Sequence, residues 1–491
     1  PEKAEYNYVK EVDYISGAAI LLGRDLWERI GGFDERYAPA YCEDSDLAFE
    51  VRKAGYRVVY QPRSKVIHFE GVSNGTDVEG TGLKRYQVEN SEKLREKWKD
   101  ELKKQCVNTG NPSPFRARER SMGKKILVVI DHYVPTWDRD AGSKTTFQYL
   151  KLFLKKGYVV KFVGDNYLHE EPYTGILQQM GIEVLYGQEY LTGIWDWLEK
   201  NGKEIHAVYL NRPHIATKYV DFISDHTDIR MIYYGHDLHF LREFREYELT
   251  GDVKKRQESE YWKAIEFSLM HKVAVSYYPS QVEADAIRAQ DDTIPVKAIT
   301  AYVYENFLDR IEEDFAKREG LLFVGGFAHP PNAGAVLRFV REVFPLIRKA
   351  LGKVNFYVVG SRVTDEIQAL HSPEQGVIIR GFVSDEELAA LYQSCRIVAV
   401  PLRYGAGVKG KVVEALYHGA PVVTTSVGSE GIPQAGEVME VADGAEAFAA
   451  AVIRLYGDAG RLLEMSKKTQ RYIREHYSVE AAWETIRDDF R

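Results

Sequence analysis

The stretch PLRYGAGVKGKVVEALYHGAPVVTT, residues 401–425, directly follows the apolar run RIVAV at residues 396–400. Its pattern predicts the end of a strand, a glycine-rich turn with Gly405, Gly407 and Gly410, then a helix and a second buried strand. In such a unit the backbone N–H groups converge at the helix N-terminus, the helix dipole favours anions, and glycine lets a ligand approach closely. The stretch therefore predicts a phosphate-binding site in an α/β protein.

Charged residues in the same stretch support this interpretation. Lys409 and Lys411 place two cations in the turn, Arg403 lies just before it, and Glu414 lies one turn into the helix. A lysine at a helix N-terminus is unfavourable with the helix dipole, which favours an anionic ligand there over two solvated lysines. We expect Glu414 to reach a sugar hydroxyl.

Composition limits the classes of function. A chain of 491 residues is long enough for about three domains. Its net charge of −8, from 65 basic and 73 acidic residues, excludes bulk nucleic-acid binding. Three widely spaced cysteines form no metal or disulfide pattern, and no apolar run is long enough to span a membrane. We expect a cytoplasmic protein with at most peripheral contact at the inner face of the membrane.

Apolar runs alternate with helical patterns from residue 124 onward, which predicts a parallel, doubly wound sheet. The pattern restarts near Arg318 and predicts a second such domain, with Asn332 as the N-cap of its first long helix and a capping box at residues 384–387. The expected parts are a partial unit at 1–104, a linker at 105–123, a first Rossmann-like domain at 124–310, a second at 311–475, and a C-terminal helix at 476–491 that crosses back to the first.

Polar residues gather in three loops of the first of these domains, at residues 138–143, 211–214 and 235–239. Ligands of doubly wound sheets bind at the carboxyl ends of the strands, where such loops lie. The histidines at 235–239 are expected to donate hydrogen bonds and not to bind a metal. Further candidates for phosphate or acceptor contacts are Arg139, Asp140 and Arg212.

Two doubly wound domains in tandem, with a glycine-rich anion loop in the second, resemble the GT-B fold. Over residues 124–491 the chain resembles the retaining glycosyltransferases of family four. The resemblance is carried, in chain order, by Gly142-Ser143, His236-Asp237, Gly325-Gly326, Gly381-Phe-Val383 and the loop at 403–414. It implies a nucleotide diphosphate sugar as donor, retention of stereochemistry, and no metal or other cofactor in the GT-B part.

The resemblance also implies roles for single residues. Glu414 matches the second of two glutamates of that family and would hold the donor ribose. His236 matches the histidine beside the transferred sugar, with Asp237 next to it as the other catalytic candidate. The remaining positions implied at the donor site are Gly142, Gly325, Gly326, Gly405 and Gly407.

The chain departs from the family pattern at three positions. The first glutamate falls on Ala406, the arginine after Gly325 is Gly326, and no lysine stands at Asn332. We expect Arg403, Lys409 and Lys411 to supply the missing positive charge and to bind the leaving diphosphate. We also expect the donor sugar to be held differently from the family norm, as a deoxy sugar with fewer hydroxyls would be.

Residues 1–104 resemble the acceptor half of the inverting glycosyltransferases of family two, which have the GT-A fold. The resemblance rests on Gly31–Glu35, Glu43-Asp44, Ala54–Val58 and His68. It implies that Asp44 is the general base and that His68 helps to hold a divalent metal in an intact GT-A unit. The nucleotide-binding half should precede Tyr14, so we expect an inactive remnant here. We further expect a buried strand at residues 14–22 and a charged helix at 91–105 that packs against the preceding unit.

The leading prediction is an enzyme that moves a hexose, or a deoxyhexose such as rhamnose, to a growing polysaccharide or a lipid-linked glycan. In its natural form it would be part of a bifunctional chain with two transferase units. One alternative is a nucleotide-sugar epimerase of GT-B fold, which acts on the donor alone. Another is a non-catalytic module that binds a nucleotide or a glycan.

Overall fold

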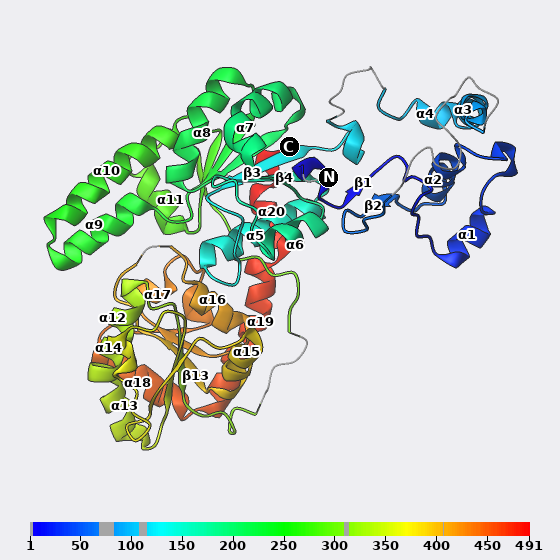
Figure 1. Ribbon diagram of the computed structural model, residues 1–491. Helices are drawn as coiled ribbons and strands as arrows, with labels where there is room; N and C mark the ends of the chain where they lie inside the picture. Colours follow the sequence, from blue (N-terminus) through cyan, green and yellow to red (C-terminus); the bar gives the residue numbers. More distant parts are fainter. Residues whose placement is uncertain (1–2, 68–82, 108–114, 309–313, 406) are drawn as a thin grey trace. The chain divides into compact units, whose positions relative to one another are not determined.

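The computed structural model describes residues 3–67, 83–107, 115–308, 314–405 and 407–491 (Figure 1). His68 and Ala406 lie outside the described residues. The chain forms two compact units. The first consists of Pro1–Val134, Phe153–Tyr209 and Phe222–Arg230, and the second of Pro135–Leu152, Leu210–Asp221 and Met231–Arg491.

One sheet has, within the described residues, seven strands in the order β5-β4-β3-β6-β7-β8-β9. Strand pairs such as β3–β4 and β7–β8 are parallel, with Ile126 opposite Val159 and Ile232 opposite Val275. All residues of β3 are buried, which explains its unbroken apolar sequence. The strands are β3 (Ile126–Asp131), β4 (Val159–Gly164), β5 (Glu183–Leu185), β6 (Ala207–Asn211), β7 (Arg230–Tyr234), β8 (Val275–Tyr278) and β9 (Val296–Ala298).

Helices alternate with these strands, as the sequence pattern predicts. The loop after β7 leads into two longer helices, α9 and α10, that pack against each other (Figure 1). The helices are α5 (Ala141–Lys155), α6 (Tyr173–Gln179), α7 (Gln188–Asn201), α8 (Pro213–His226), α9 (His239–Thr250), α10 (Val253–Met270) and α11 (Gln281–Arg288).

The other large sheet has the order β12-β11-β10-β13-β14-β15, and its strands pair in parallel. The predicted α/β class with two parallel sheets is thus confirmed. The strands are β10 (Leu321–Val324), β11 (Phe356–Val359), β12 (Val377–Gly381), β13 (Ile397–Val400), β14 (Val422–Thr424) and β15 (Glu440–Val441). The helices are α12 (Pro330–Arg338), α13 (Phe344–Leu351), α14 (Asp365–Gln368), α15 (Asp385–Ser394), α16 (Gly410–Tyr417), α17 (Ser426–Ser429), α18 (Ala445–Tyr456), α19 (Ala459–Tyr477) and α20 (Val479–Ile486).

The first long helix of this region begins earlier than predicted. Its N-cap is His329, with Pro330 and Pro331 in the first turn, so the prediction of Asn332 as the N-cap is wrong. Proline suits the first helical turn because the N–H groups of that turn have no intrahelical acceptor, so a residue without an N–H loses no hydrogen bond there. The side chain of Asn332 is free for other bonds and donates to the carbonyl of Gly326 at 2.7 Å.

The last residues of the chain contact the first of the two sheets. After α20, a short 3-10 turn, Arg487–Phe490, carries Asp489. Its carboxylate accepts hydrogen bonds from Tyr277 Oη at 2.6 Å and from Lys297 Nζ at 2.7 Å. These two partners lie on β8 and β9.

The N-terminal part contains a short antiparallel pair, β1 (Lys10–Glu11) and β2 (Val59–Tyr60), and the helices α1 (Arg24–Ile30), α2 (Glu43–Lys53), α3 (Arg85–Lys97) and α4 (Lys99–Leu102). The predicted buried strand at residues 14–22 is wrong, since the segment is irregular and Leu21 is fully exposed. A strand needs a neighbour for its backbone groups, and no described strand pairs with this segment.

The charged segment at residues 91–105 packs against α2, as predicted. The ring of Trp98 stacks on Phe49 with centroids 5.0 Å apart, and its Nε1 donates to Asp46 at 2.6 Å. The predicted linker is in part a packed segment, because Phe115, Glu119 and Ser121 are buried.

Candidate functional site

The loop between β13 and α16 has the backbone that its glycines suggest. Gly405 and Gly407 have φ angles of +137° and +71°, in a region that other residues rarely adopt. A side chain at Gly410 would collide with Tyr302, because a Cβ there would lie 2.3 Å from the Tyr302 hydroxyl oxygen. The helix therefore begins close against Tyr302, and the turn ahead of it keeps its unusual shape.

Lys411 reaches away from this loop to the segment after β10. Its Nζ donates to Asn332 Oδ1 and lies 5.0 Å from the centre of the Phe323 ring. A Cβ added at Gly325 would lie 3.1 Å from the same amine, so glycine is what leaves room for it. Burial, and then repulsion from Lys409, lowers the pKa of Lys411 to about 7. Among the residues that the structure describes, no carboxylate forms an ion pair with this amine, which favours an anionic ligand.

Lys409 remains within the loop. Its Nζ donates to the carbonyl of Gly407 at 2.5 Å. Burial lowers its pKa to about 8, against the opposing effects of Glu430 and Glu283. Glu430 is already paired with Arg245 at 2.9 Å.

Glu283 is a residue of this site that sequence reasoning missed. It is fully buried on α11, where its carboxyl accepts from the backbone N–H of Leu238 at 3.0 Å and from Ser280 Oγ at 2.8 Å. Burial raises its pKa to about 8. The available signal was the Ser280-Gln-Val-Glu283 pattern, which is a helix-start signature and does not by itself indicate a ligand.

The loop after β7 positions the two predicted catalytic residues differently. His236 has a φ of +62°, and its Nε2 lies 3.0 Å from Asn211 Oδ1 while its ring packs on Tyr234 at 4.2 Å. A positive φ at a non-glycine residue is a backbone strain of the kind found at functional sites. Asp237 pairs with Arg242.

Asp237 also belongs to a charged cluster at the start of α9. Burial alone would raise its pKa, but His239, Arg242 and His236 hold it below its usual value. His239 Nδ1 lies 3.1 Å from Glu266 Oε1, and this bond contributes to a raised pKa of the imidazole. Asp237 is therefore an ionised group with cationic neighbours, suited to hydrogen bonding and less to proton abstraction. Sequence reasoning missed Arg242 and Glu266.

The first glycine loop is built around Asp140. Its carboxylate accepts from the backbone N–H of Ser143 at 2.8 Å and from Ser143 Oγ at 2.7 Å, at the start of α5. Arg212, with a φ of +62°, lies 3.9 Å from Asp140. A Cβ at Gly142 would lie 2.8 Å from Arg212 Nη2, so the guanidinium closely approaches this glycine. Arg139 is exposed nearby in sequence.

Glu414 is engaged by two partners. Lys144 on α5 lies 3.2 Å from its Oε1, and Tyr392 Oη donates to its Oε2 at 3.3 Å. A ribose hydroxyl would have to share or replace one of these contacts. Arg403 is exposed, and a Cβ placed at Gly326 would make an ordinary contact of 3.4 Å with Ser361 Oγ.

Several predicted residues of the second unit form separate contact groups, besides those of His236, Asp237 and Lys409 described above. Lys411, Asn332 and Gly325 form one group, Gly142, Asp140 and Arg212 a second, and Glu414 with Lys144 a third. Asp44 belongs to the first unit, where its carboxylate accepts from the backbone N–H of Gly17 at 2.9 Å and of Ser45 at 2.7 Å. The first bond ties Gly17 to α2, and the second lies within the first turn of that helix.

Neither a metal site nor a membrane span appears in the part of the chain that the structure describes. No group of three or more His, Cys, Asp or Glu residues there has the geometry to hold a metal ion. Likewise, none of the described helices combines the length and apolar character that crossing a bilayer requires.

Comparison with known proteins places this geometry in a class. Residues 318–458 match the family described as glycosyl transferases group 1. The fold is similar to that of TarM, with a TM-score of 0.58 at 12% identity over 74% of this chain and 98% of that chain. It is also similar to HepE from Anabaena, crystallised with UDP, with a TM-score of 0.53 at 14% identity over 74% of this chain and 99% of that one. The family match is confined to residues 318–458, and the similarity to these structures gives the chain the GT-B arrangement of two parallel sheets.

Curated relatives match only parts of the chain. An uncharacterized 44.6 kDa protein from the cps region of Klebsiella pneumoniae is 28% identical over 172 residues, or 34% of this chain and 44% of that protein. The N-acetylglucosaminyl-diphospho-decaprenol L-rhamnosyltransferase of Mycobacterium tuberculosis is 41% identical over 68 residues, or 14% of this chain and 22% of that protein. The chain thus spans less than half the length of each of these relatives.

Proposed function

We propose that the chain transfers a sugar from a nucleotide diphosphate sugar to a glycan acceptor, with Lys409 and Lys411 binding the donor diphosphate. The observation that carries this proposal is the position of Lys411. Its amine hydrogen-bonds Asn332 and lies beside Gly325, at the carboxyl end of β10. It therefore brings positive charge to the loop after β10. The family pattern has an arginine and a lysine in this loop, where the present chain has Gly326 and Asn332.

Two half-buried amines at that loop suit the chemistry of the reaction. Negative charge grows on the diphosphate as the glycosidic bond breaks, and cations fixed near it stabilise the transition state. Glu414 would hold the ribose, and His236 and Asp237 would contact the transferred sugar. Retention of the anomeric configuration is part of the proposal and is checked by NMR of the first product formed.

The acceptor and the donor sugar are proposed from the relatives. The Mycobacterium tuberculosis relative is, by its name, a rhamnosyltransferase that acts on a lipid-linked sugar. The Klebsiella relative is encoded in a cps region. We propose a hexose or deoxyhexose such as rhamnose as the transferred sugar, and a polysaccharide or lipid-linked glycan as the acceptor.

For the N-terminal part we propose the acceptor half of a GT-A unit in a bifunctional chain. Its support is the resemblance around Asp44, a residue of the first turn of α2. His68, the proposed metal-binding residue of an intact unit, lies outside the described residues.

A thermal-shift screen of nucleotide sugars, followed by mass spectrometry of the products, tests the proposal. A donor at a hundredfold excess over its Kd should stabilise the protein by about 2.7 kcal/mol. A transferase forms a longer glycan only when acceptor is present. Conversion of the donor sugar without acceptor would instead indicate an epimerase, and binding without transfer or hydrolysis a binding module.

A further inference from the structure

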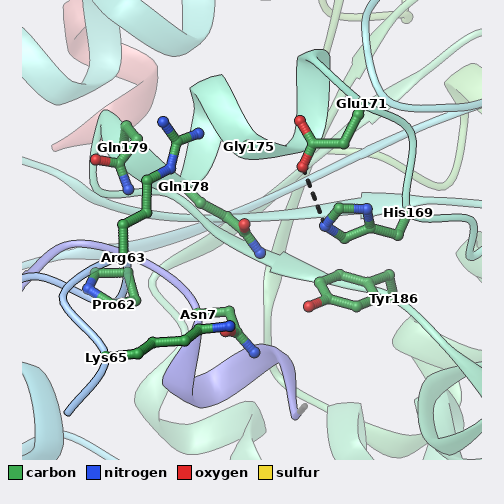
Figure 2. A pocket seen from close by; sticks show the side chains of 10 residues that line it. All are labelled: Asn7, Pro62, Arg63, Lys65, His169, Glu171, Gly175, Gln178, Gln179 and Tyr186. Carbon is green, nitrogen blue, oxygen red and sulfur yellow. Dashed lines mark ion pairs between the residues drawn. The ribbon is translucent and has the colours of Figure 1, made fainter. Parts of the chain in front are cut away.

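A polar pocket lies in the first unit, and it shares no lining residue with the candidate donor site (Figure 2). Its volume is about 400 Å³, within the range of small-molecule sites. One side is formed by the N-terminal part of the chain and the other by the segment from β4 to β5. These two segments are joined by a backbone hydrogen bond of 2.9 Å from Val9 N–H to the carbonyl of Gln178.

Gln178 gives this pocket a polar group that lacks a partner. Its side chain lies on α6 and is only 6% exposed. Its Nε2 has no hydrogen-bond partner among the residues that the structure describes. Figure 2 shows the amide pointing into the space between Asn7 and His169. Buried polar side chains are nearly always paired, so an amide left open at a pocket wall points to a ligand.

Charged and aromatic groups surround the same space. Arg63 and Lys65 are exposed at one side, and Glu171 at the other. A Cβ at Gly175 would lie 3.0 Å from Arg63 Nη2 and 2.7 Å from Glu171 Oε2, so both charged groups lie over this glycine. One carboxylate for two cations leaves the pocket with a positive balance, and a guanidinium binds a carboxylate with two parallel hydrogen bonds.

The far side of the pocket is aromatic. Tyr186 and His169 meet edge to face, with ring centroids 4.7 Å apart and planes at 74°. His169 Nε2 lies 3.7 Å from Glu171. An aromatic wall beside amides and a guanidinium matches the mixed character of a sugar ring, which has apolar C–H faces and polar hydroxyls.

We propose that this pocket is a glycan-binding site for an acidic saccharide, separate from the donor site. Arg63 binds the carboxylate of a uronic acid unit, the amide of Gln178 pairs with a ring hydroxyl, and Tyr186 packs on a sugar face. Such a site would hold an acidic polysaccharide chain on the first unit. The binding itself does not depend on the proposed transfer reaction.

Calorimetric titration of the full chain with trigalacturonic acid tests this site, with maltotriose as the neutral probe and inorganic phosphate as the simple anion. We expect trigalacturonic acid to bind and maltotriose to bind at least about tenfold more weakly. Equal binding of the two trisaccharides would overturn the acidic specificity. Failure of trigalacturonic acid to bind at millimolar concentration, or phosphate binding as tightly, would overturn the saccharide site.

Three substitutions locate the binding. Arg63→Gln removes the guanidinium, Gly175→Ala pushes the two flexible charged side chains aside from within a helix, and Arg24→Gln makes the same change at an exposed position outside the pocket. The first two should weaken trigalacturonic acid binding about tenfold or more and leave Tm and UDP affinity unchanged. Equal affinities for all three variants would place the ligand elsewhere and refute the proposal.

Discussion

Lys411 brings a positive charge to the segment after β10 from another part of the chain, the start of α16. The segment after β10 carries Gly326 and Asn332 where the family pattern has basic residues. The structure brings the Lys411 amine to Asn332 from the start of α16. A flexible four-carbon stem makes this exchange feasible, since only the ammonium must arrive at the same place.

The substitution Lys411→Met should weaken binding of the donor diphosphate. Methionine keeps most of the apolar stem beside Phe323 and removes the charge. We expect the Kd for UDP to rise about tenfold to a hundredfold, because a charge-assisted contact to phosphate contributes roughly 1.5–3 kcal/mol. Isothermal titration calorimetry measures the change.

Lys353→Met is the matched control, because this lysine is exposed beyond the end of α13. Its UDP affinity should equal that of the unchanged protein. If Lys411→Met bound UDP as tightly as the control, Lys411 would have no part in the diphosphate site.

Donor affinity should fall as pH rises. Before binding, burial holds the pKa of Lys411 at about 7 and that of Lys409 at about 8, while the diphosphate requires both amines protonated. Glu283, with a pKa raised to about 8, gains a negative charge in the same range. We expect the UDP association constant to fall by about tenfold per pH unit just above pH 7 and more steeply above pH 8. A flat profile from pH 7 to 9 in calorimetric titrations would contradict the role of these amines.

At the scale of single elements, the sequence predicts what local rules determine. The capping box of Ser384 and Glu387 is present at α15, and the glycine turn before α16 has the positive φ angles that its composition indicates. Such local patterns do not predict structure correctly where neighbouring residues or a distant pairing partner determine it. Asn332 follows two prolines that start the helix earlier. Residues 14–22 have the composition of a strand, but none of the described strands pairs with them.

The residues of the candidate site, like the helices and strands, could be predicted from the sequence only in part. The loop with Lys409 and Lys411 could be read from the spacing of glycines and charges. Glu283 and Arg242 could not, because their importance comes from burial against Leu238 and from pairing with Asp237, contacts that only the folded chain creates.

The close fit of α16 against Tyr302 gives an element-scale prediction. In Gly410→Ala the new methyl would lie 2.3 Å from the Tyr302 hydroxyl oxygen. We expect the free energy of unfolding to fall by about 1–3 kcal/mol, the usual cost of overpacking, measured from the midpoint of urea unfolding.

Two further variants separate this clash from a general effect of the added methyl. Gly334→Ala, on α12 with open space around it, should be neutral or stabilising by up to about 1 kcal/mol. Tyr302→Phe removes the clashing oxygen and should recover part of the loss in the double variant. An unfolding midpoint of Gly410→Ala equal to that of Gly334→Ala would show that the contact is not tight.

At the scale of the whole molecule, a buried ionic network anchors the N-terminal residues within the first unit. Tyr8 Oη donates to Glu119 at 2.5 Å, Lys161 lies 2.9 Å from Glu119 and 2.5 Å from Glu183, and Arg118 lies 2.7 Å from Glu183. Each charge has an opposite neighbour, as burial requires. The network therefore ties the segment around Tyr8 to Lys161 on β4 and Glu183 on β5 through Glu119 and Arg118.

Removal of the phenolic hydroxyl in Tyr8→Phe should loosen this anchor. A hydrogen bond to a carboxylate contributes about 1.5–3 kcal/mol, and in the variant Glu119 loses this bond while it keeps its ion pair with Lys161. Hydrogen exchange of the Val9 amide, which is bonded to Gln178, should accelerate roughly tenfold or more. Tyr14→Phe, at an exposed tyrosine, is the control; the same exchange rate in both variants would show that the network does not hold the segment.

The lowered pKa of Lys411 should affect the binding enthalpy that a calorimetric titration of this protein with UDP measures. At neutral pH its amine is only partly protonated, so a diphosphate that binds there draws hydrogen ions from the buffer. The apparent binding enthalpy then contains the ionisation enthalpy of the buffer. The apparent enthalpies measured in Tris and in HEPES should therefore differ, in proportion to the number of hydrogen ions that the protein takes up on binding. In the proposed transfer, departure of the nucleoside diphosphate would return these hydrogen ions to the solvent, so that each turnover would include a small local uptake and release of acid.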